Sequence, residues 1–122
     1  MEILPIGRVI GNEGGRAEIE VLPEYQEGLF RIEENDRILV LYIFDRTTEV
    51  RMRVHPRGDP RNPEVGVFAS RSPMRPNHIA VTEVRLVAVE GNKLTVEGLD
   101  ALDGSPVVDI KPVKRRDQAN LP

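Results

Sequence analysis

Cysteine is absent from this sequence of 122 residues. Its absence excludes disulfide bonds, cysteine nucleophiles and thiolate metal sites, and it is typical of proteins that work in a reducing compartment. No apolar run approaches the roughly 20 residues that cross a bilayer, and the first ten residues lack the pattern of a secretion signal. We therefore expect a cytoplasmic protein that does not enter a membrane.

Familiar catalytic motifs are also scarce. The two histidines, His55 and His78, lack the spacing of a zinc-binding helix, so we expect no metal site. Ser70 and Ser72 lack the G-x-S-x-G context of a hydrolase nucleophile. The glycine-rich segment GNEGGR, residues 11–16, lacks the lysine of a phosphate-binding loop and predicts a hairpin turn instead.

Short strand-like segments dominate the sequence, and 122 residues suffice for one domain with one modest core. Gly, Pro and Asn separate seven such segments, which are RVI, AEIEV, RILVLYIF, EVRMRVH, EVGVFA, IAVTEVRLVAV and KLTVEGL. Residues 22–36 are the one place suited to a helical turn or two. The pattern predicts an all-β protein, a small barrel of about seven strands with short loops, followed by a polar tail over residues 113–122.

Charge is distributed unevenly along the chain, although the net charge is only −3. Residues 1–45 hold four Arg and ten acidic residues (−6), and residues 46–75 hold seven Arg and three acidic residues (+4). Within this basic part, EVRMRVH would place Arg51, Arg53 and His55 on one face of a strand, about 7 Å apart. Two interpretations stay open, namely a solvated face of a half-buried strand and a contact with nucleic-acid phosphates.

Two loops carry most of the remaining polar chemistry. In ASRSPMRPN, two prolines stiffen the backbone that holds Arg71 and Arg75, which suits recognition of a carboxylate or a phosphate. In LDALDGSPVVDIKP, residues 99–112, Asp100 and Asp103 flank a turn that Gly104 closes. These carboxylates either accept hydrogen bonds from a ligand or simply cap the turn.

GVFASRSPMRPNHIAV and LDALDGSPVVDIKP together resemble the motifs of one known family. The TsaA-like, or tRNA methyltransferase O, family has the pattern G-V-F-A-T-R-S-P-x-R-P-N-P-I-G, followed by L-D-x-x-D-G-T-P-V-L-D-I-K-P. The resemblance is strong over residues 65–112, and PIGRVIG, RILVLYIF and VHPRG match more weakly. It implies a single-sheet β-barrel over residues 1–112, usually a homodimer, that binds S-adenosylmethionine and methylates N6 of the adenosine 3′ of the anticodon (position 37) in certain tRNAs.

The resemblance also implies which positions bind the cofactor, and the chemistry of these and nearby side chains gives each a candidate role. The cofactor-binding positions are Asp45, Arg46, Arg71, Ala80, Val81, Asp100, Ala101, Leu102 and Asp103. Arg71 would pair with the methionine carboxylate, and Asp100 or Asp103 would accept a hydrogen bond from the ribose or the amino group. The candidate catalytic residue is Asn77, because its amide oxygen can accept a hydrogen bond from N6 of the adenine. The candidate tRNA-binding residues, which would contact phosphates, are Arg51, Arg53, Arg57 and Arg75.

The sequence departs from the family pattern at several positions. Asp45 replaces the usual histidine, His78 replaces the proline after Asn77, and Ala80 replaces the glycine before Val81. An early loop containing Pro-Arg-Gln is absent. Three functions therefore stay open: a tRNA methyltransferase that uses S-adenosylmethionine, a family member that binds the cofactor without methylating tRNA, and a non-enzymatic RNA-binding barrel.

Overall fold

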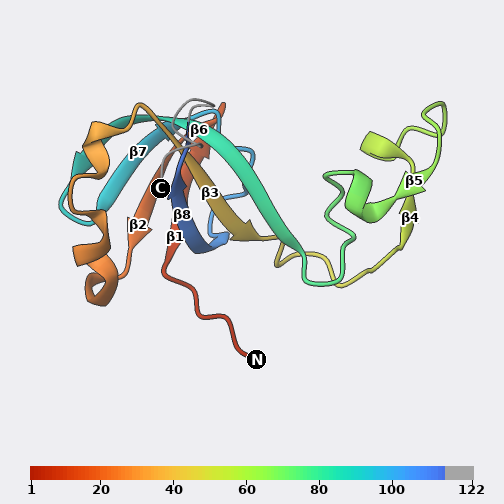
Figure 1. The fold of residues 1–122 in the computed structure, drawn as a ribbon, viewed down its shortest axis with the longest axis horizontal. Helices are drawn as coiled ribbons and strands as arrows, with labels where there is room; N and C mark the ends of the chain where they lie inside the picture. Colours follow the sequence, from red (N-terminus) through yellow and green to blue (C-terminus); the bar gives the residue numbers. More distant parts are fainter. Residues whose placement is uncertain (115–122) are drawn as a thin grey trace.

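Six antiparallel strands form a closed barrel in the computed structural model, which describes residues 1–114. Neighbouring strands are hydrogen-bonded in the order β1-β2-β7-β6-β3-β8, and the barrel that they form is at the left of Figure 1. The strands are β1 (Gly7–Glu13), β2 (Arg16–Val21), β3 (Arg37–Ile43), β6 (Ile79–Glu90), β7 (Lys93–Glu97) and β8 (Pro106–Pro112). The predicted β-barrel is confirmed. Strand β8 lies in the segment that the sequence assigned to a loop, and most of the predicted tail lies outside the described residues.

Two of the predicted strands do not belong to the barrel. EVRMRVH contributes only β4 (Arg53–Val54), and EVGVFA contributes β5 (Val65–Gly66) before a 3-10 turn, η4 (Val67–Ala69). These two strands pair with each other as a separate small sheet. The expected alternation fails because the segment has no core beneath it, so that Val50 and Met52 are 46% and 54% exposed.

Residues 44–78 form an arm between β3 and β6, and this arm projects from one end of the barrel (Figure 1). Its small sheet is continued by hydrogen bonds from Val67 N to Met52 O (2.9 Å) and from Arg51 N to Met74 O (2.8 Å). The arm is therefore held by its own polar contacts more than by the barrel core.

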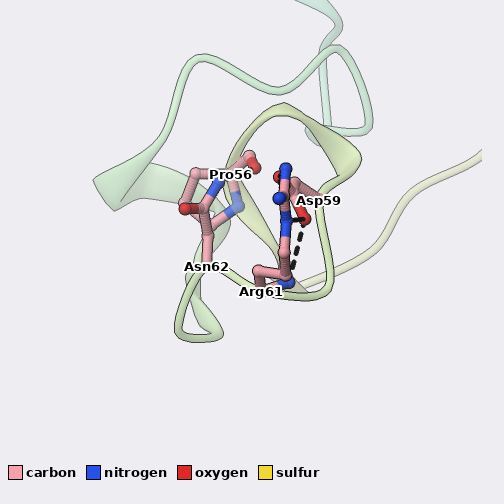
Figure 2. A network of polar contacts seen from close by, with 4 residues as sticks. All are labelled: Pro56, Asp59, Arg61 and Asn62. Atoms are coloured by element: carbon pink, nitrogen blue, oxygen red, sulfur yellow. Dashed lines mark hydrogen bonds and ion pairs between the residues drawn. The ribbon is translucent and has the colours of Figure 1, made fainter.

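The tip of the arm, residues 55–64, contains the short turn η3 (Pro56–Gly58) and a compact polar network. The Asn62 amide donates to Pro56 O over 2.8 Å, while Arg61 and Asp59 form an ion pair of 2.7 Å (Figure 2). Hydrogen bonds from the Arg61 side chain lower the pKa of Asp59. Three prolines and these contacts make the tip a structured loop.

The barrel interior is filled by the inward-facing residues of every strand, as the alternating pattern requires. Strand β3 shows this pattern most clearly, because Ile38, Val40 and Tyr42 are buried while their neighbours are not. The helical turns expected over residues 22–36 are two 3-10 turns, η1 (Pro23–Leu29) and η2 (Ile32–Glu34), and Leu29 of η1 closes the core. Within the described residues, no helix has the length and apolar character needed to span a membrane.

Gly7 provides a test of the packing between β1 and β2. A Cβ atom at this position would lie 2.3 Å from the backbone oxygen of Glu20, so the two strands would have to separate. We expect Gly7→Ala to lower the free energy of unfolding by about 1–3 kcal/mol, measured by urea denaturation. Gly28→Ala is the matched control, because nothing lies within 4 Å of its Cβ position. Equal stability of the two variants would contradict the packing described here.

Candidate functional site

Three adjoining hollows lie where the arm meets the barrel. The β6 hollow (about 480 Å³) and the turn hollow (about 310 Å³) share Phe44 and Asp100, and the turn hollow shares Pro73 with the arginine hollow (about 520 Å³). The β6 hollow is lined by residues 79–83 of β6 and by Tyr42, Phe68, Ser70, Arg71 and Arg75. The turn hollow is lined by residues 45–47, 100–102 and Ser105, and the arginine hollow by arm residues.

Eight of the nine predicted cofactor-binding residues line the β6 hollow or the turn hollow. Arg71, Ala80 and Val81 lie in the first, Asp100 in both, and Asp45, Arg46, Ala101 and Leu102 in the second. The ninth, Asp103, lines neither. Its carboxylate accepts a hydrogen bond from Gly11 N (2.9 Å), and its backbone oxygen accepts one from the Arg46 guanidinium. Asp103 therefore joins the turn to β1 and positions Arg46.

Tyr42 lines the β6 hollow and holds the Asp100 turn, which borders both hollows. Its side chain is 2% exposed, and its hydroxyl donates to the backbone oxygen of Asp100 over 2.7 Å. Because that bond uses its one proton, the Thr82 hydroxyl must donate the second contact, of 2.9 Å. Burial raises the pKa of Tyr42, and the Asp100 carboxylate adds to this effect. Tyr42 thus ties β3, β6 and the Asp100 turn together.

The loop that carries Arg71 and Arg75 is stiffened by more than its prolines. The Arg75 guanidinium donates to Ser70 O (3.0 Å) and Ser72 O (3.2 Å), so this half-buried side chain holds the loop from inside. Arg71 is exposed and donates to Val81 O over 3.1 Å, which ties the loop to β6. The two arginines therefore differ in position, since Arg71 lies open to a ligand and Arg75 supports the loop.

His78 shows what one departure from the family pattern does to the backbone. Its φ angle is +52°, in the left-handed region, and its N–H donates to Arg75 O over 3.0 Å. Proline, with φ fixed near −65° and no N–H, cannot adopt this conformation. The turn here therefore cannot have the same backbone as one with proline at this position. Asn77, in the same turn, is exposed and lines none of the three hollows.

Three of the four predicted tRNA-binding arginines line the arginine hollow. Arg51 forms an ion pair with Glu49 (2.6 Å), and Arg53 forms one with Glu64 (2.9 Å). Within residues 1–114, Arg57 forms no ion pair. The regular 7 Å spacing expected along a strand does not apply, because only Arg53 of the three lies in a strand.

Aromatic side chains form a part of the site that the sequence motifs did not predict. Tyr42 and Phe44 contact each other edge to face, with ring centroids 5.7 Å apart, and both line the β6 hollow. Phe30 and Phe68, in contrast, are not core residues, because they are 80% and 72% exposed. Phe68 also lines the β6 hollow, and its position within the GVFASR motif is the only sequence signal for this. Among the described residues, no group of three or more His, Cys, Asp or Glu is placed to hold a metal ion.

The fold and site define a small antiparallel β-barrel with a ligand-sized cleft at one end, formed by strand ends and an arm rather than by a Rossmann-type sheet. The sequence profile of the tRNA-methyltransferase O N-terminal domain matches residues 6–118, and the chain belongs to this family.

Individual relatives agree with this assignment. An S-adenosyl-L-methionine-binding protein of Archaeoglobus fulgidus is 48% identical over 95 residues, which cover 78% of this chain and 67% of the relative. A Pyrococcus horikoshii protein, named as a probable S-adenosyl-L-methionine-binding protein, is 41% identical over 114 residues. The match covers 90% of this chain and 80% of the relative.

A crystal structure of TrmO from Pseudomonas aeruginosa has a similar fold, with a TM-score of 0.71 and 30% sequence identity. The similarity covers 93% of this chain but only 56% of the crystallised one. Another Archaeoglobus relative, 52% identical over 95 residues, is matched over 25% of its length. The chain thus spans about half, or less, of the length of some relatives.

Tyr42→Phe tests the hydrogen bonds that hold the Asp100 turn. Removing the hydroxyl leaves Asp100 O and the Thr82 hydroxyl without this partner, so we expect the free energy of unfolding to fall by about 1–3 kcal/mol at pH 7. Because the folded state raises the pKa of Tyr42, the wild-type protein should also lose stability as the pH rises above about 10. Tyr42→Phe should lack that alkaline loss. Urea denaturation between pH 7 and pH 11 measures both effects, and parallel pH profiles would contradict the second.

Proposed function

We propose that this chain is an S-adenosylmethionine-dependent methyltransferase that acts on tRNA, with the cofactor bound across the β6 hollow and the turn hollow. The observation that carries the proposal is the convergence of residues 45–46, 71, 80–81 and 100–102 on two hollows that share Phe44 and Asp100. The names of the relatives support the choice of cofactor. When bound, S-adenosylmethionine supplies an activated methyl group.

The residues present fit such a cofactor in size and chemistry. Volumes of about 310 and 480 Å³ are those of small-molecule sites. The turn hollow offers apolar side chains, Phe44, Pro73 and Leu102, to an adenine ring. Arg71 offers a guanidinium to the methionine carboxylate, and the Asp100 carboxylate, at the junction of the hollows, suits an ammonium or ribose hydroxyls. Asp45, which also lines the turn hollow, would offer a negative charge to the sulfonium.

The chain's part in methyl transfer would be to orient the acceptor and exclude water rather than to activate the methyl group. For the acceptor we propose N6 of the adenosine at position 37. Asn77 would accept a hydrogen bond from that amine and so direct its lone pair. Its exposed place in the turn at residues 76–77 leaves it accessible to an RNA and outside the cofactor hollows.

The arm would hold the tRNA through its phosphates. Arg51, Arg53 and Arg57 converge on one hollow next to the turn hollow, so phosphates bound there would lie beside the cofactor. Such contacts position an RNA without reading its sequence. Arg75 is less suited to this role, because its guanidinium already donates to loop carbonyls.

A homodimer is a further part of the proposal. Val50 and Met52 on the arm, and Ile3 and Leu4 before β1, are each more than 45% exposed. Residues 1–6 run away from the barrel (Figure 1). Exposed apolar side chains on two projecting segments are suited to a contact with a second copy.

A second function is favoured by the names and lengths of the relatives. The Archaeoglobus and Pyrococcus proteins are named for cofactor binding alone, and the chain spans 56% of the crystallised TrmO. The alternative is therefore a protein that binds S-adenosylmethionine but does not methylate tRNA.

Cofactor binding is tested by titration calorimetry of the wild-type protein and of Arg71→Ala. We expect the wild type to bind S-adenosylmethionine and Arg71→Ala to bind it about tenfold more weakly, because the carboxylate loses a charged partner. Arg85→Ala is the control, since Arg85 pairs with Glu97 on the barrel surface and lines neither cofactor hollow. An affinity within twofold of the wild type for Arg71→Ala would contradict the assigned site.

The same preparations then distinguish the two functions. The wild-type protein is incubated with unmodified tRNA and labelled cofactor, and the nucleosides are analysed. Label in N6-methylated adenosine at position 37 supports the methyltransferase. Cofactor binding without label in tRNA supports the alternative, and a folded protein that binds no cofactor excludes both.

Arg57 tests the role of the arm. We expect Arg57→Ala to weaken tRNA binding and to reduce the slope of log affinity against log salt concentration by about 1, because one phosphate contact is lost. Arg61→Ala is the control, since the Arg61 guanidinium is engaged by Asp59 in the same loop. A filter-binding salt titration measures both slopes, and equal slopes for the wild type and Arg57→Ala would rule out the contact.

A further inference from the structure

Phe68 is an exposed aromatic side chain on a rigidly held backbone. It lies on η4, between Val67, which is 1% exposed, and a loop stiffened by hydrogen bonds. Val67 N donates to Met52 O (2.9 Å), and Val67 O accepts from Ser70 N (3.1 Å) and the Ser70 hydroxyl (2.8 Å). The phenyl ring is nevertheless 72% exposed. A well-anchored turn thus presents one large apolar face to solvent.

The surroundings of Phe68 point to a nucleobase as the group that covers it. The ring borders the β6 hollow, which also contains Arg71 and Asp100. The turn η4 that carries Phe68 directly follows β5, and Gly66 of β5 is the register partner of Arg53, which lines the arginine hollow. A nucleotide whose phosphate contacts Arg53 could therefore place its base against this ring.

We propose that the face of Phe68 is a stacking site for a base of the acceptor RNA at the open side of the β6 hollow. The proposal rests on the proposed function, because it needs an RNA on the arm. Aromatic rings bind unpaired bases of any sequence by stacking. The apolar seat for the cofactor's own adenine is supplied separately by Phe44, Pro73 and Leu102 in the turn hollow, which Phe68 does not line. Phe68 is therefore available to the acceptor.

The experiment uses the absence of tryptophan from the chain. Phe68→Trp makes residue 68 the single tryptophan, and stacking of a base on it should quench its fluorescence when an unmodified anticodon stem-loop RNA is added. Phe30→Trp is the matched control, because Phe30 is also highly exposed (80%) but lies directly after η1 and outside the arm. This variant should show no comparable quenching. Quenching of Phe68→Trp by S-adenosylmethionine alone would overturn the proposal, because the ring would then serve the cofactor.

Affinity measurements provide the second test. Phe68→Ala should bind the stem-loop at least fivefold more weakly, and Phe68→Tyr should bind it as the wild type does. Because Phe68 borders the β6 hollow, the test is that Phe68→Ala weakens RNA binding by a larger factor than it weakens cofactor binding. If Phe68→Ala bound RNA normally, or altered the oligomeric state in light scattering, the stacking site would be wrong. Failure of the wild-type protein itself to bind the RNA would overturn the proposed substrate as well, so the two failures are distinguishable.

Discussion

The hydrogen bond from the Tyr42 hydroxyl to the backbone oxygen of Asp100 is the contact on which the site depends. Tyr42 lies at the end of β3, where it is paired with Ala80 of β6 and Val107 of β8. Strand β3 is therefore held on both sides, and its last buried residue reaches across to the turn that follows β7. Pairing of β3 with β6 places residues 45–46 and 80–81 at the same end of the barrel, and the Tyr42 side chain holds the turn at residues 100–102 beside them. A buried hydroxyl without a hydrogen-bond partner costs free energy, so the folded protein favours the one arrangement in which Tyr42 bonds to Asp100 O.

The arm and the barrel are stabilised by different kinds of interaction. The barrel is stabilised by interdigitated aliphatic side chains, whereas the arm has few buried apolar residues and is held by prolines, short turns and side-chain bonds to backbone oxygens. Its ion pairs are exposed and contribute little to stability. What these contacts provide is a stiff scaffold for arginines and for one phenyl ring, so that less conformational entropy is lost when a ligand binds.

Charge and architecture coincide in this molecule. The acidic part of the chain, residues 1–45, forms three barrel strands and the 3-10 turns, while the basic residues 46–75 lie in the arm. A polyanion approaching the protein is therefore attracted to the arm and repelled by the acidic barrel surface. The β6 hollow and the turn hollow lie at the boundary between the two, and Arg71 and Asp100 give the β6 hollow one positively charged and one negatively charged group.

The sequence by itself determined five of the six barrel strands, because the alternation of apolar residues in segments such as RILVLYI is a local property that matches the inward and outward faces of a sheet. It also determined the family, because two long motifs survive in order, and with them eight residues that line the β6 hollow or the turn hollow. Other features were decided only by the tertiary structure. EVRMRVH alternates yet has no core to cover, Asp103 binds Gly11, and Phe68 remains in solvent. The physical reason is that the burial of a side chain and its hydrogen-bond partners depend on contacts between residues far apart in the chain. Tyr42 and Asp100, 58 positions apart, are brought together only when the barrel closes.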